Sequence, residues 1–159
     1  MKEIKLTQGK VAIVDDEYYD DISQFKWCAF KHRNTYYAVR NIIVGGRWKT
    51  LLMHRYILNM KTGICVDHVN GDGLFNVKEN LRHCTNQENQ RNRHSQKNNK
   101  LRIKGVRWCK IASKFKSQIG IGGKTIHLGY FNVMGDADSA YRIAEEKYFG
   151  EFARGLKNG

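Results

Sequence analysis

The chain has 159 residues, enough for one ordinary domain or two small ones, and a hydrophobic content of 41% with 3 Trp, 8 Tyr and 7 Phe excludes a disordered chain. No apolar run approaches the roughly 18 residues of a membrane span, and the first residues lack the apolar stretch of a secretory signal, so we expect a cytoplasmic protein. The 28 Lys+Arg against 15 Asp+Glu give a net charge of +13 and a pI near 9.7, an excess that indicates a polyanionic partner.

The positive charge is concentrated in the second half of the chain. Residues 1–85 hold 13 basic and 9 acidic residues, whereas residues 86–159 hold 15 basic and 6 acidic ones. The run from 91 to 116 has ten basic residues and no acidic one. A solvated surface is the simpler interpretation, but clustering of one sign favours a nucleic-acid partner.

Residues 1–60 are predicted to be mainly strands. The ranges 10–14, 25–30 and 36–43 alternate or are rich in aromatic and β-branched residues, with turns expected at 31–34 and 44–47. Residues 48–60 are apolar and end in a partly helical pattern. This segment carries no motif with an assigned role, and a further DNA-contacting sheet is one hypothesis for it. Five clustered carboxylates, interpreted as a solvated loop rather than a metal site, are Asp15, Asp16, Glu17, Asp20 and Asp21.

Residues 61–93 are expected to form a strand, a loop, a second strand and a helix. The range 64–69 is strand-like, and 70–73 is a cluster of turn residues. Residues 81–84 can return as the second strand. Thr85 and Glu88 form a capping box, which predicts the start of a helix.

The remainder is predicted to be a basic linker followed by a second small domain. Residues 94–103 are polar and bury little. Three strands are expected at 105–111, 114–121 and 124–131, with a tight turn at Gly122-Gly123, and a helix at 136–149. The predicted organisation is a β-rich segment (1–60), a chemistry-bearing core (61–93), a linker (94–103) and a C-terminal domain (104–159), in an α+β fold.

A resemblance to a known family lies within the core. Asp67-His68, Asn80 and Asn89, at steps of twelve and nine residues, resemble the HNH motif of the ββα-metal nucleases. The surrounding text, in 66–72, 79–82 and 85–89, is similar to the HNH homing endonucleases of phages and group I introns, and the match covers about residues 53–93. Asn89 stands where many relatives have His, although an H-N-N version is known in the family.

These residue types suit the hydrolysis of a phosphodiester bond. A neutral His can accept a proton from water, so His68 is the candidate general base. Asp67 is the next residue on the strand and faces the opposite side. Asp67 and Asn89 offer hard oxygen ligands for Mg²⁺ or Mn²⁺. In the resemblance, Asn80 orients His68 through side-chain or backbone hydrogen bonds. The competing interpretation is a polar turn with an incidental His.

Several further residues are candidates for contact with nucleic acid. His54 and Arg55 are candidate phosphate contacts, with a structural hydrogen bond as an equal alternative for His54. Arg82 is expected to contact the DNA backbone or the scissile phosphate. Arg91 and Arg93 belong to the basic run. His83 and His94 are interpreted as surface residues, and the four cysteines, Cys28, Cys65, Cys84 and Cys109, as reduced thiols rather than a zinc site.

The C-terminal domain resembles the plant ethylene-response-factor (APETALA-type) DNA-binding domain. The similar stretches are 104–107, 123–131 and 138–144 with Gly150 after them. That family packs a three-stranded sheet on one helix and lays the sheet in the major groove. Lysines replace arginines of the plant pattern, which weakens bidentate guanine recognition. The predicted DNA-binding residues are Arg107, Trp108, Lys110, Lys114, Lys116 and Gln118.

Together these observations predict a metal-dependent DNA endonuclease of the homing type. An HNH core would be preceded by a β-rich segment and followed by a three-stranded antiparallel sheet packed on one helix. We expect double-stranded DNA as the partner, a monomer, cleavage of one strand or of both, and residence in a host cytoplasm if a phage encodes it. Two alternatives stay open: a non-cleaving DNA-binding protein on a degenerate HNH scaffold, and an RNA-binding protein suggested by charge alone.

Overall fold

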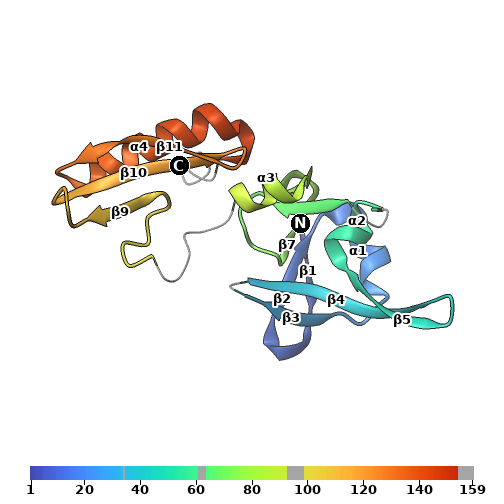
Figure 1. Ribbon diagram of the computed structural model, residues 1–159. Helices are drawn as coiled ribbons and strands as arrows, with labels where there is room; N and C mark the ends of the chain where they lie inside the picture. The colour runs from blue at the N-terminus through green and yellow to red at the C-terminus, as the bar shows by residue number, and fades with distance from the viewer. Residues whose placement is uncertain (34, 61–63, 93–98, 154–159) are drawn as a thin grey trace. The chain divides into compact units, whose positions relative to one another are not determined.

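The computed structural model describes residues 1–33, 35–60, 64–92 and 99–153. Its fold is α+β with strands in the majority, which confirms the predicted class (Figure 1). The chain divides into two compact units, Met1–Asn89 and Gln90–Gly159, each with its own hydrophobic core. Among the described residues, no helix is long and apolar enough to cross a membrane.

The N-terminal unit contains short strands, three of them in a hairpin-linked meander. Its strands are β1 (Lys2–Lys5), β2 (Val11–Val14), β3 (Cys28–His32), β4 (Thr35–Val44), β5 (Arg47–Leu52), β6 (Cys65–His68), β7 (Phe75–Asn76) and β8 (Leu81–Cys84). Its helices are η1 (Thr7–Gly9), α1 (Asp16–Ser23), α2 (Met53–Ile57) and η2 (Lys78–Asn80), and α3 (Asn86–Arg91) lies at the boundary between the units.

Three sheets organise this unit in the described residues. β3, β4 and β5 form an antiparallel sheet, and β6 pairs with β8 alone. β1 and β2 are antiparallel, and β7 joins β2 in parallel, with Ile13 opposite Phe75 and Val14 opposite Asn76. The parallel pairing matters for the site because it brings residues 75–76 onto the sheet formed by the start of the chain.

One core joins the first 60 residues to β6–β8. Nine buried apolar side chains form it: Ile4, Ala12, Val14, Ile22, Trp27, Ala38, Met53, Ile57 and Leu81. Leu81 belongs to β8, and Val66 of β6 packs against the same cluster. Residues 1–60 and the strands β6–β8 therefore share one hydrophobic core and belong to one compact unit.

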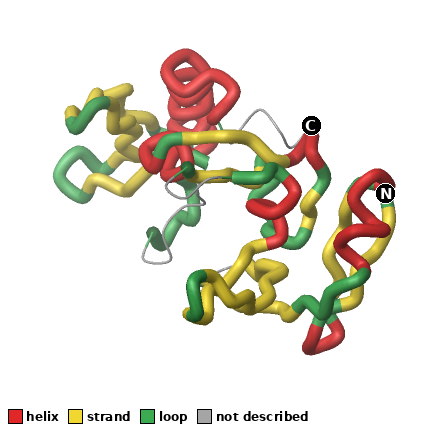
Figure 2. The backbone as a smooth tube through the Cα atoms, turned by 90° about the vertical axis from the view of Figure 1, so that its right-hand side faces the viewer, coloured by secondary structure: helices red, strands yellow, loops and turns green. Residues whose placement is uncertain are grey.

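The acidic run contains a helix where the sequence was interpreted as a solvated loop. α1 begins after Asp15, an extended residue with φ −67° and ψ 152°. Asp16 and Glu17 lie in its first turn, where carboxylates are favourable next to the positive end of the helix dipole. Ile22 is fully buried against the core, so burial of one apolar residue adds to local propensity. Figure 2 shows the start of the chain beside α1, where the Met1 amino group lies 2.8 Å from Asp16 Oδ1.

The C-terminal unit is an antiparallel sheet with a helix on it. Its elements are β9 (Val106–Cys109), β10 (Lys114–Ile121), β11 (Lys124–Phe131), α4 (Met134–Phe149) and η3 (Gly150–Phe152). β10 is the central strand, and α4 packs on all three strands (Figure 1). The three strands and the helix lie where the sequence predicted them, and α4 begins two residues earlier. Lys104 Nζ pairs at 2.9 Å with the buried carboxylate of Glu145.

Candidate active site

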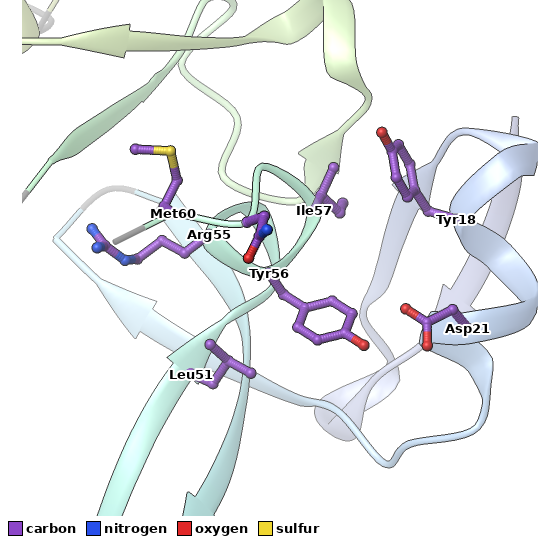
Figure 3. A pocket seen from close by; sticks show the side chains of 8 residues that line it. Tyr18, Asp21, Leu51, Arg55, Tyr56, Ile57 and Met60 are labelled. Atoms are coloured by element: carbon purple, nitrogen blue, oxygen red, sulfur yellow. The ribbon is translucent and has the colours of Figure 1, made fainter. Parts of the chain in front are cut away.

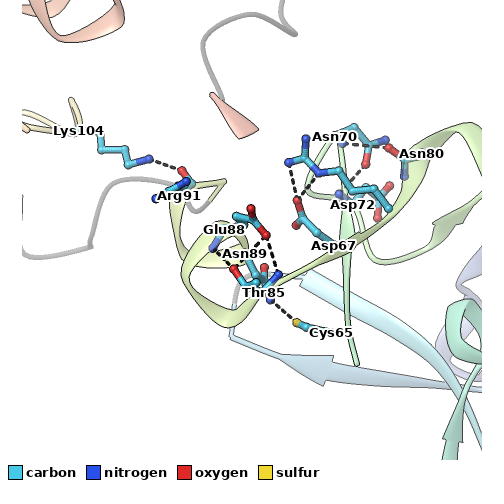
Figure 4. A network of polar contacts seen from close by, with 11 residues as sticks. Cys65, Asp67, Asn70, Asp72, Asn80, Thr85, Glu88, Asn89, Arg91 and Lys104 are labelled. Atoms are coloured by element: carbon cyan, nitrogen blue, oxygen red, sulfur yellow. Dashed lines mark hydrogen bonds and ion pairs between the residues drawn. The ribbon is translucent and has the colours of Figure 1, made fainter. Parts of the chain in front are cut away.

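The strand–loop–strand–helix order predicted for the core is present. Asp67 lies opposite Arg82 and His68 opposite Leu81 in the β6–β8 ladder. The predicted capping box also forms: the Glu88 backbone N–H donates to Thr85 Oγ1 at 3.2 Å, and the Thr85 N–H donates to Glu88 Oε2 at 2.8 Å (Figure 4). This local geometry fixes where α3 begins relative to the end of β8.

Asn80 ties down the loop that follows His68. Its Oδ1 accepts from the Asn70 N–H at 2.9 Å, and its Nδ2 donates to the Phe75 carbonyl at 2.7 Å. Its backbone carbonyl accepts from the Val69 N–H at 2.8 Å. Figure 4 shows Asn80 beside Asn70. Asn80, predicted to orient His68, therefore acts on the backbone next to His68, and its side-chain amide is engaged by the loop.

The side chain that contacts His68 directly is Asn76, which the sequence did not single out. His68 Nε2 lies 3.1 Å from Asn76 Oδ1. Asn76 Nδ2 donates to the Leu74 carbonyl at 3.1 Å, and a carbonyl can only accept, so the amide oxygen is the atom that faces His68. Nε2 consequently carries the proton, and Nδ1 is the basic nitrogen. Asn76 is fully buried because β7 pairs with β2, a long-range contact without a local sequence pattern.

Two aromatic rings confine His68. Its centroid lies 4.9 Å from that of His54, edge to face, and 5.8 Å from that of Tyr37. His54 and His68 are 7% and 5% exposed. Burial lowers the pKa of His68, against the opposing effects of Asn76 and nearby carboxylates, and so keeps the ring neutral at pH 7. Burial, together with His68 and Arg55, lowers the pKa of His54 to about 3.

The two candidate phosphate contacts beside β5 differ in their surroundings. His54 is buried and neutral, which favours the structural alternative over a charge-based contact. Arg55 is half-buried, and its guanidinium donates to the Ile64 carbonyl at 2.7 Å. Arg55 also lines a surface pocket of about 370 Å³ at α2 (Figure 3). Tyr18, Asp21 and Tyr56 line the same pocket, which does not include His68.

Asp67 is held by Arg82. Its Oδ2 accepts from Arg82 at 2.6 Å (the terminal nitrogen) and 3.0 Å (Nε), and the two side chains are 7% and 13% exposed. A buried carboxylate needs such a partner because desolvation penalises its charge. Arg82, predicted to contact phosphate, therefore has a partner within the protein, and its contact with DNA stays a prediction.

Asn89 lies on the same side of β6 as Asp67. Asn89 Nδ2 donates to Cys65 Sγ at 3.3 Å (Figure 4), and Cys65 is two residues before Asp67, hence on the same strand face. One carboxylate and one amide oxygen are hard donors that suit Mg²⁺ or Mn²⁺ with water and phosphate completing the coordination. Among the described residues, no group of three or more His, Cys, Asp or Glu side chains is arranged to hold a metal.

Cys65 and Cys84 face each other across the β6–β8 ladder. None of the four cysteines, all of which are among the described residues, forms a disulfide, in agreement with the prediction of reduced thiols. Burial, together with the hydrogen bond to Cys65, raises the pKa of Cys84 to about 12. The Cys84 thiol is therefore protonated and a poor nucleophile or metal ligand at neutral pH.

The exposed face of the C-terminal sheet combines cations and polar side chains. Arg107 lies opposite Lys116, and Cys109 lies opposite Lys114, so these residues share the face away from α4. Gln118 continues this face along β10. The register between β10 and β11 shifts after Ser117, which places His127 opposite Gln118 and Tyr130 opposite Lys116. His127 and Tyr130 therefore join the face, and their rings lie 4.7 Å apart.

The shift explains why the sequence did not indicate His127 and Tyr130. They are three residues apart, and strict alternation would put them on opposite faces. Gly129, with φ 143°, lies between them and permits the irregular backbone. Trp108, predicted to bind DNA, lies on the helix-bearing face, where its ring contacts Phe115 edge to face at 4.9 Å.

The other predicted DNA-binding residues are less uniform. Lys110 is exposed in the turn after β9. The Arg91 guanidinium lies over the Phe149 ring, 4.7 Å from its centroid, and the Arg91 carbonyl accepts from Lys104 Nζ. Arg93 and the first half of the predicted linker, residues 94–98, lie outside the described residues.

Fold and site together define a small basic α+β protein with a buried, neutral histidine on a strand–loop–strand–helix element. No family model matches the chain, and no solved structure matches it. The chain is similar to an uncharacterized HNH endonuclease of Acanthamoeba polyphaga mimivirus, 28% identical over 153 residues, which cover 92% of this chain and 74% of the relative. This distant similarity supports a relationship to the HNH nucleases, and nuclease activity in general terms.

Proposed function

We propose that the protein is a metal-dependent DNA endonuclease of the homing type, which hydrolyses phosphodiester bonds at a site recognised partly by its C-terminal unit. The observation that carries the proposal is His68: a neutral imidazole with a fixed tautomer, on the strand where the HNH motif places its base. The similarity to a protein named an HNH endonuclease supports the same class.

His68 acts as the general base in this proposal. Asn76 keeps the proton on Nε2, so Nδ1 accepts the proton of the attacking water. His54 and Tyr37 restrict the ring from the other sides, and Asn80 holds the backbone of the loop that follows. Because His68 is 5% exposed, bulk water has little access to it, and in this proposal the attacking water arrives with the bound phosphate.

A divalent metal is the proposed cofactor, with Asp67 and Asn89 as its ligands. Bound Mg²⁺ or Mn²⁺ would neutralise charge at phosphorus and at the leaving oxygen. Arg82 orients the Asp67 carboxylate through a buried ion pair. The amide of Asn89, which donates through Nδ2 to Cys65, is positioned by that contact and supplies its oxygen.

The C-terminal unit is the proposed reader of double-stranded DNA, with an APETALA-type sheet. Arg107, Lys114, Lys116 and Gln118 supply cations and an amide on one exposed face, where phosphates and base edges can be contacted. We propose a monomer, which has one active site and nicks one strand at a time.

The test is incubation of purified protein with supercoiled plasmid and with its source genome, in Mg²⁺, in Mn²⁺ and in EDTA. We expect nicking or linearisation that requires metal and is lost in His68→Ala while DNA binding persists. His83→Ala, on the exposed side of β8, is the matched control and retains activity. Cleavage that survives in His68→Ala excludes His68 as the base.

A non-cleaving DNA-binding protein is the second candidate function. Two observations favour the non-cleaving protein. Arg82 already neutralises Asp67, and Asn89 stands where the motif more commonly has His. This candidate predicts tight, salt-sensitive binding without cleavage of the source genome in either metal.

A further inference from the structure

The outer half of the β4–β5 hairpin is an unsupported two-stranded ribbon. β3 pairs with β4 only from Thr35 to Val39, whereas β5 pairs with β4 from Val39 to Val44. Residues 40–44 and 47–51, which we call the ribbon, therefore have no third strand in the described part of the chain. Figure 1 shows the ends of β4 and β5 projecting beyond the other elements of the N-terminal unit.

The ribbon is fixed at its base. The Arg40 guanidinium lies 3.5 Å from the centroid of Phe25, with Trp27 and Tyr56 at 5.3 and 5.4 Å. Leu51, opposite Arg40 in the ladder, packs against the core. At the tip, Gly45 and Gly46 have φ of 58° and 73°, the positive values of the tight turn that suits the strand twist. The ribbon is therefore an ordered projection anchored to the core.

Its two faces differ in chemistry. Ile43 lies opposite Trp48, and Asn41 lies opposite Thr50, so these four side chains share one face. Thr50 Oγ1 and Asn41 Oδ1 are hydrogen-bonded at 3.2 Å. Arg47 and Lys49 lie on the other face, and both are exposed. Trp48 is 73% exposed and Ile43 is 62% exposed. Neighbouring apolar side chains that are this exposed are typical of a surface that binds a partner.

We propose that the ribbon inserts into the major groove of duplex DNA. The major groove is about 12 Å wide and admits a two-stranded ribbon. The Asn41–Thr50 face would meet the bases, where an amide, a hydroxyl and apolar side chains contact base edges and thymine methyl groups. Arg47 and Lys49 are long enough to reach the phosphates that border the groove.

Charge complementarity favours DNA over another occupant. A second copy of the chain would bring Arg47 and Lys49 against a molecule with a net charge of +13, whereas a polyanion neutralises them. The inference rests on the proposed DNA-binding function and extends it, because it gives the N-terminal unit a groove-reading element of its own.

The decisive variant shortens the ribbon without changing its register. Deletion of Ile43, Val44, Arg47 and Trp48 keeps the Gly45-Gly46 turn and leaves Ile42 opposite Lys49. Arg47→Ser/Lys49→Ser and Trp48→Ser separate phosphate contact from base contact. Lys5→Ser/Lys26→Ser removes two exposed cations elsewhere in the unit and is the matched control. Equal melting temperatures of all variants establish that each one is folded.

Binding is measured in EDTA and in a His68→Ala background, so that the result does not depend on cleavage. The probe is a duplex selected from a random-sequence pool, and dimethyl sulfate reports on guanine N7 in the major groove. We expect the shortened ribbon to bind about tenfold more weakly and to lose part of the N7 protection. The double Ser variant should lower the slope of log K against log salt by roughly two.

Three results would overturn the proposal. Unchanged affinity and N7 protection in the folded shortened variant exclude the ribbon as a reader, even if the protein cuts DNA. If the shortened variant loses no more affinity than Lys5→Ser/Lys26→Ser, the ribbon contributes only non-specific positive charge. A dimer that becomes a monomer on shortening, with DNA binding intact, assigns the surface to self-association. A nuclease that fails to cut but shows the expected footprint leaves the ribbon proposal standing.

Discussion

The imidazole rings of His54 and His68 meet edge to face, with centroids 4.9 Å apart and planes at 87°. Burial is the main cause of the lowered pKa of both rings, and the pKa of His54 falls to about 3. Two neutral rings can pack in this way, whereas two imidazolium ions at this distance would repel each other. The contact therefore links the stability of the N-terminal unit to the protonation of its candidate base.

Stability should fall as the pH is lowered from 6.5 towards about 3. In this range the unfolded chain protonates His54 while the folded protein keeps it neutral, so protons favour the unfolded state. Each pH unit costs about 1.4 kcal/mol per such group. Urea unfolding across this range should show a smaller pH slope in His54→Phe than in the parent protein. His83→Phe, at an exposed position, should keep the parent slope. Equal slopes in all three proteins would contradict the assignment.

Asn76 should control the pH dependence of cleavage. Burial lowers the pKa of His68, so activity should persist below pH 6.5, and the hydrogen bond that His68 donates to Asn76 opposes this shift. Asn76→Asp places a carboxylate beside Nε2, which should raise the pKa of His68 and move the acidic limb of kcat/KM to higher pH. Asn76→Ala should move the limb to lower pH and reduce kcat about tenfold to a hundredfold. If Asn76 had only a structural role, both substitutions would lower kcat without moving the acidic limb of the kcat/KM profile.

Local patterns in the sequence predicted the elements that local energetics determine. The Thr85–Glu88 capping box, the Gly45-Gly46 turn and the three C-terminal strands depend on neighbouring residues, and the structure has them. The α1 helix could have been predicted too, because Asp15 precedes it and Ile22 supplies its buried face. The carboxylate run instead suggested a solvated loop.

Long-range pairing determines what the sequence did not indicate. Asn76 reaches His68 because β7 joins β2, and His54 reaches it from α2, which follows a different sheet. His127 and Tyr130 share a face only through the register shift after Ser117. In each case the residue type is ordinary, and the contact depends on tertiary structure rather than on spacing.

Asn80→Ala should weaken both the fold and the cleavage activity. The substitution leaves the Asn70 N–H and the Phe75 carbonyl without their side-chain partner, at a cost of about 2 to 4 kcal/mol in the free energy of unfolding. Loosening of the loop should also lower kcat, with little change in the affinity for DNA. Asn86→Ala, at the exposed start of α3, is the control and should change neither quantity. Equal effects of the two substitutions would show that the Asn80 contacts are dispensable.

Gly73 supports the ring that packs on both histidines. A Cβ at this position would lie 2.4 Å from the Tyr36 carbonyl oxygen and 2.6 Å from the Tyr37 ring. Gly73→Ala should therefore displace Tyr37 and cost about 1 to 3 kcal/mol, with a further loss of kcat because His68 is less confined. Gly135→Ala, where a Cβ meets nothing within 4 Å, should be neutral or stabilising. Urea unfolding and plasmid nicking of the two variants provide the comparison, and wild-type values for Gly73→Ala would contradict it.

Tyr130 should contribute to DNA binding although no local pattern indicates it. Tyr130 is 47% exposed, lies opposite Lys116 on the edge strand β11, and its ring contacts that of His127. Tyr130→Ala should weaken binding of duplex DNA about tenfold, because an aromatic ring on a basic sheet can pack against sugar or base edges. Trp108→Ala is a control of the same kind on the opposite face, where the ring instead packs on Phe115. It should destabilise the C-terminal unit more than it weakens binding. Fluorescence anisotropy and thermal unfolding of both variants distinguish the two roles. The reverse ranking would mean that DNA contacts the helix-bearing face of the sheet, on which Trp108 lies.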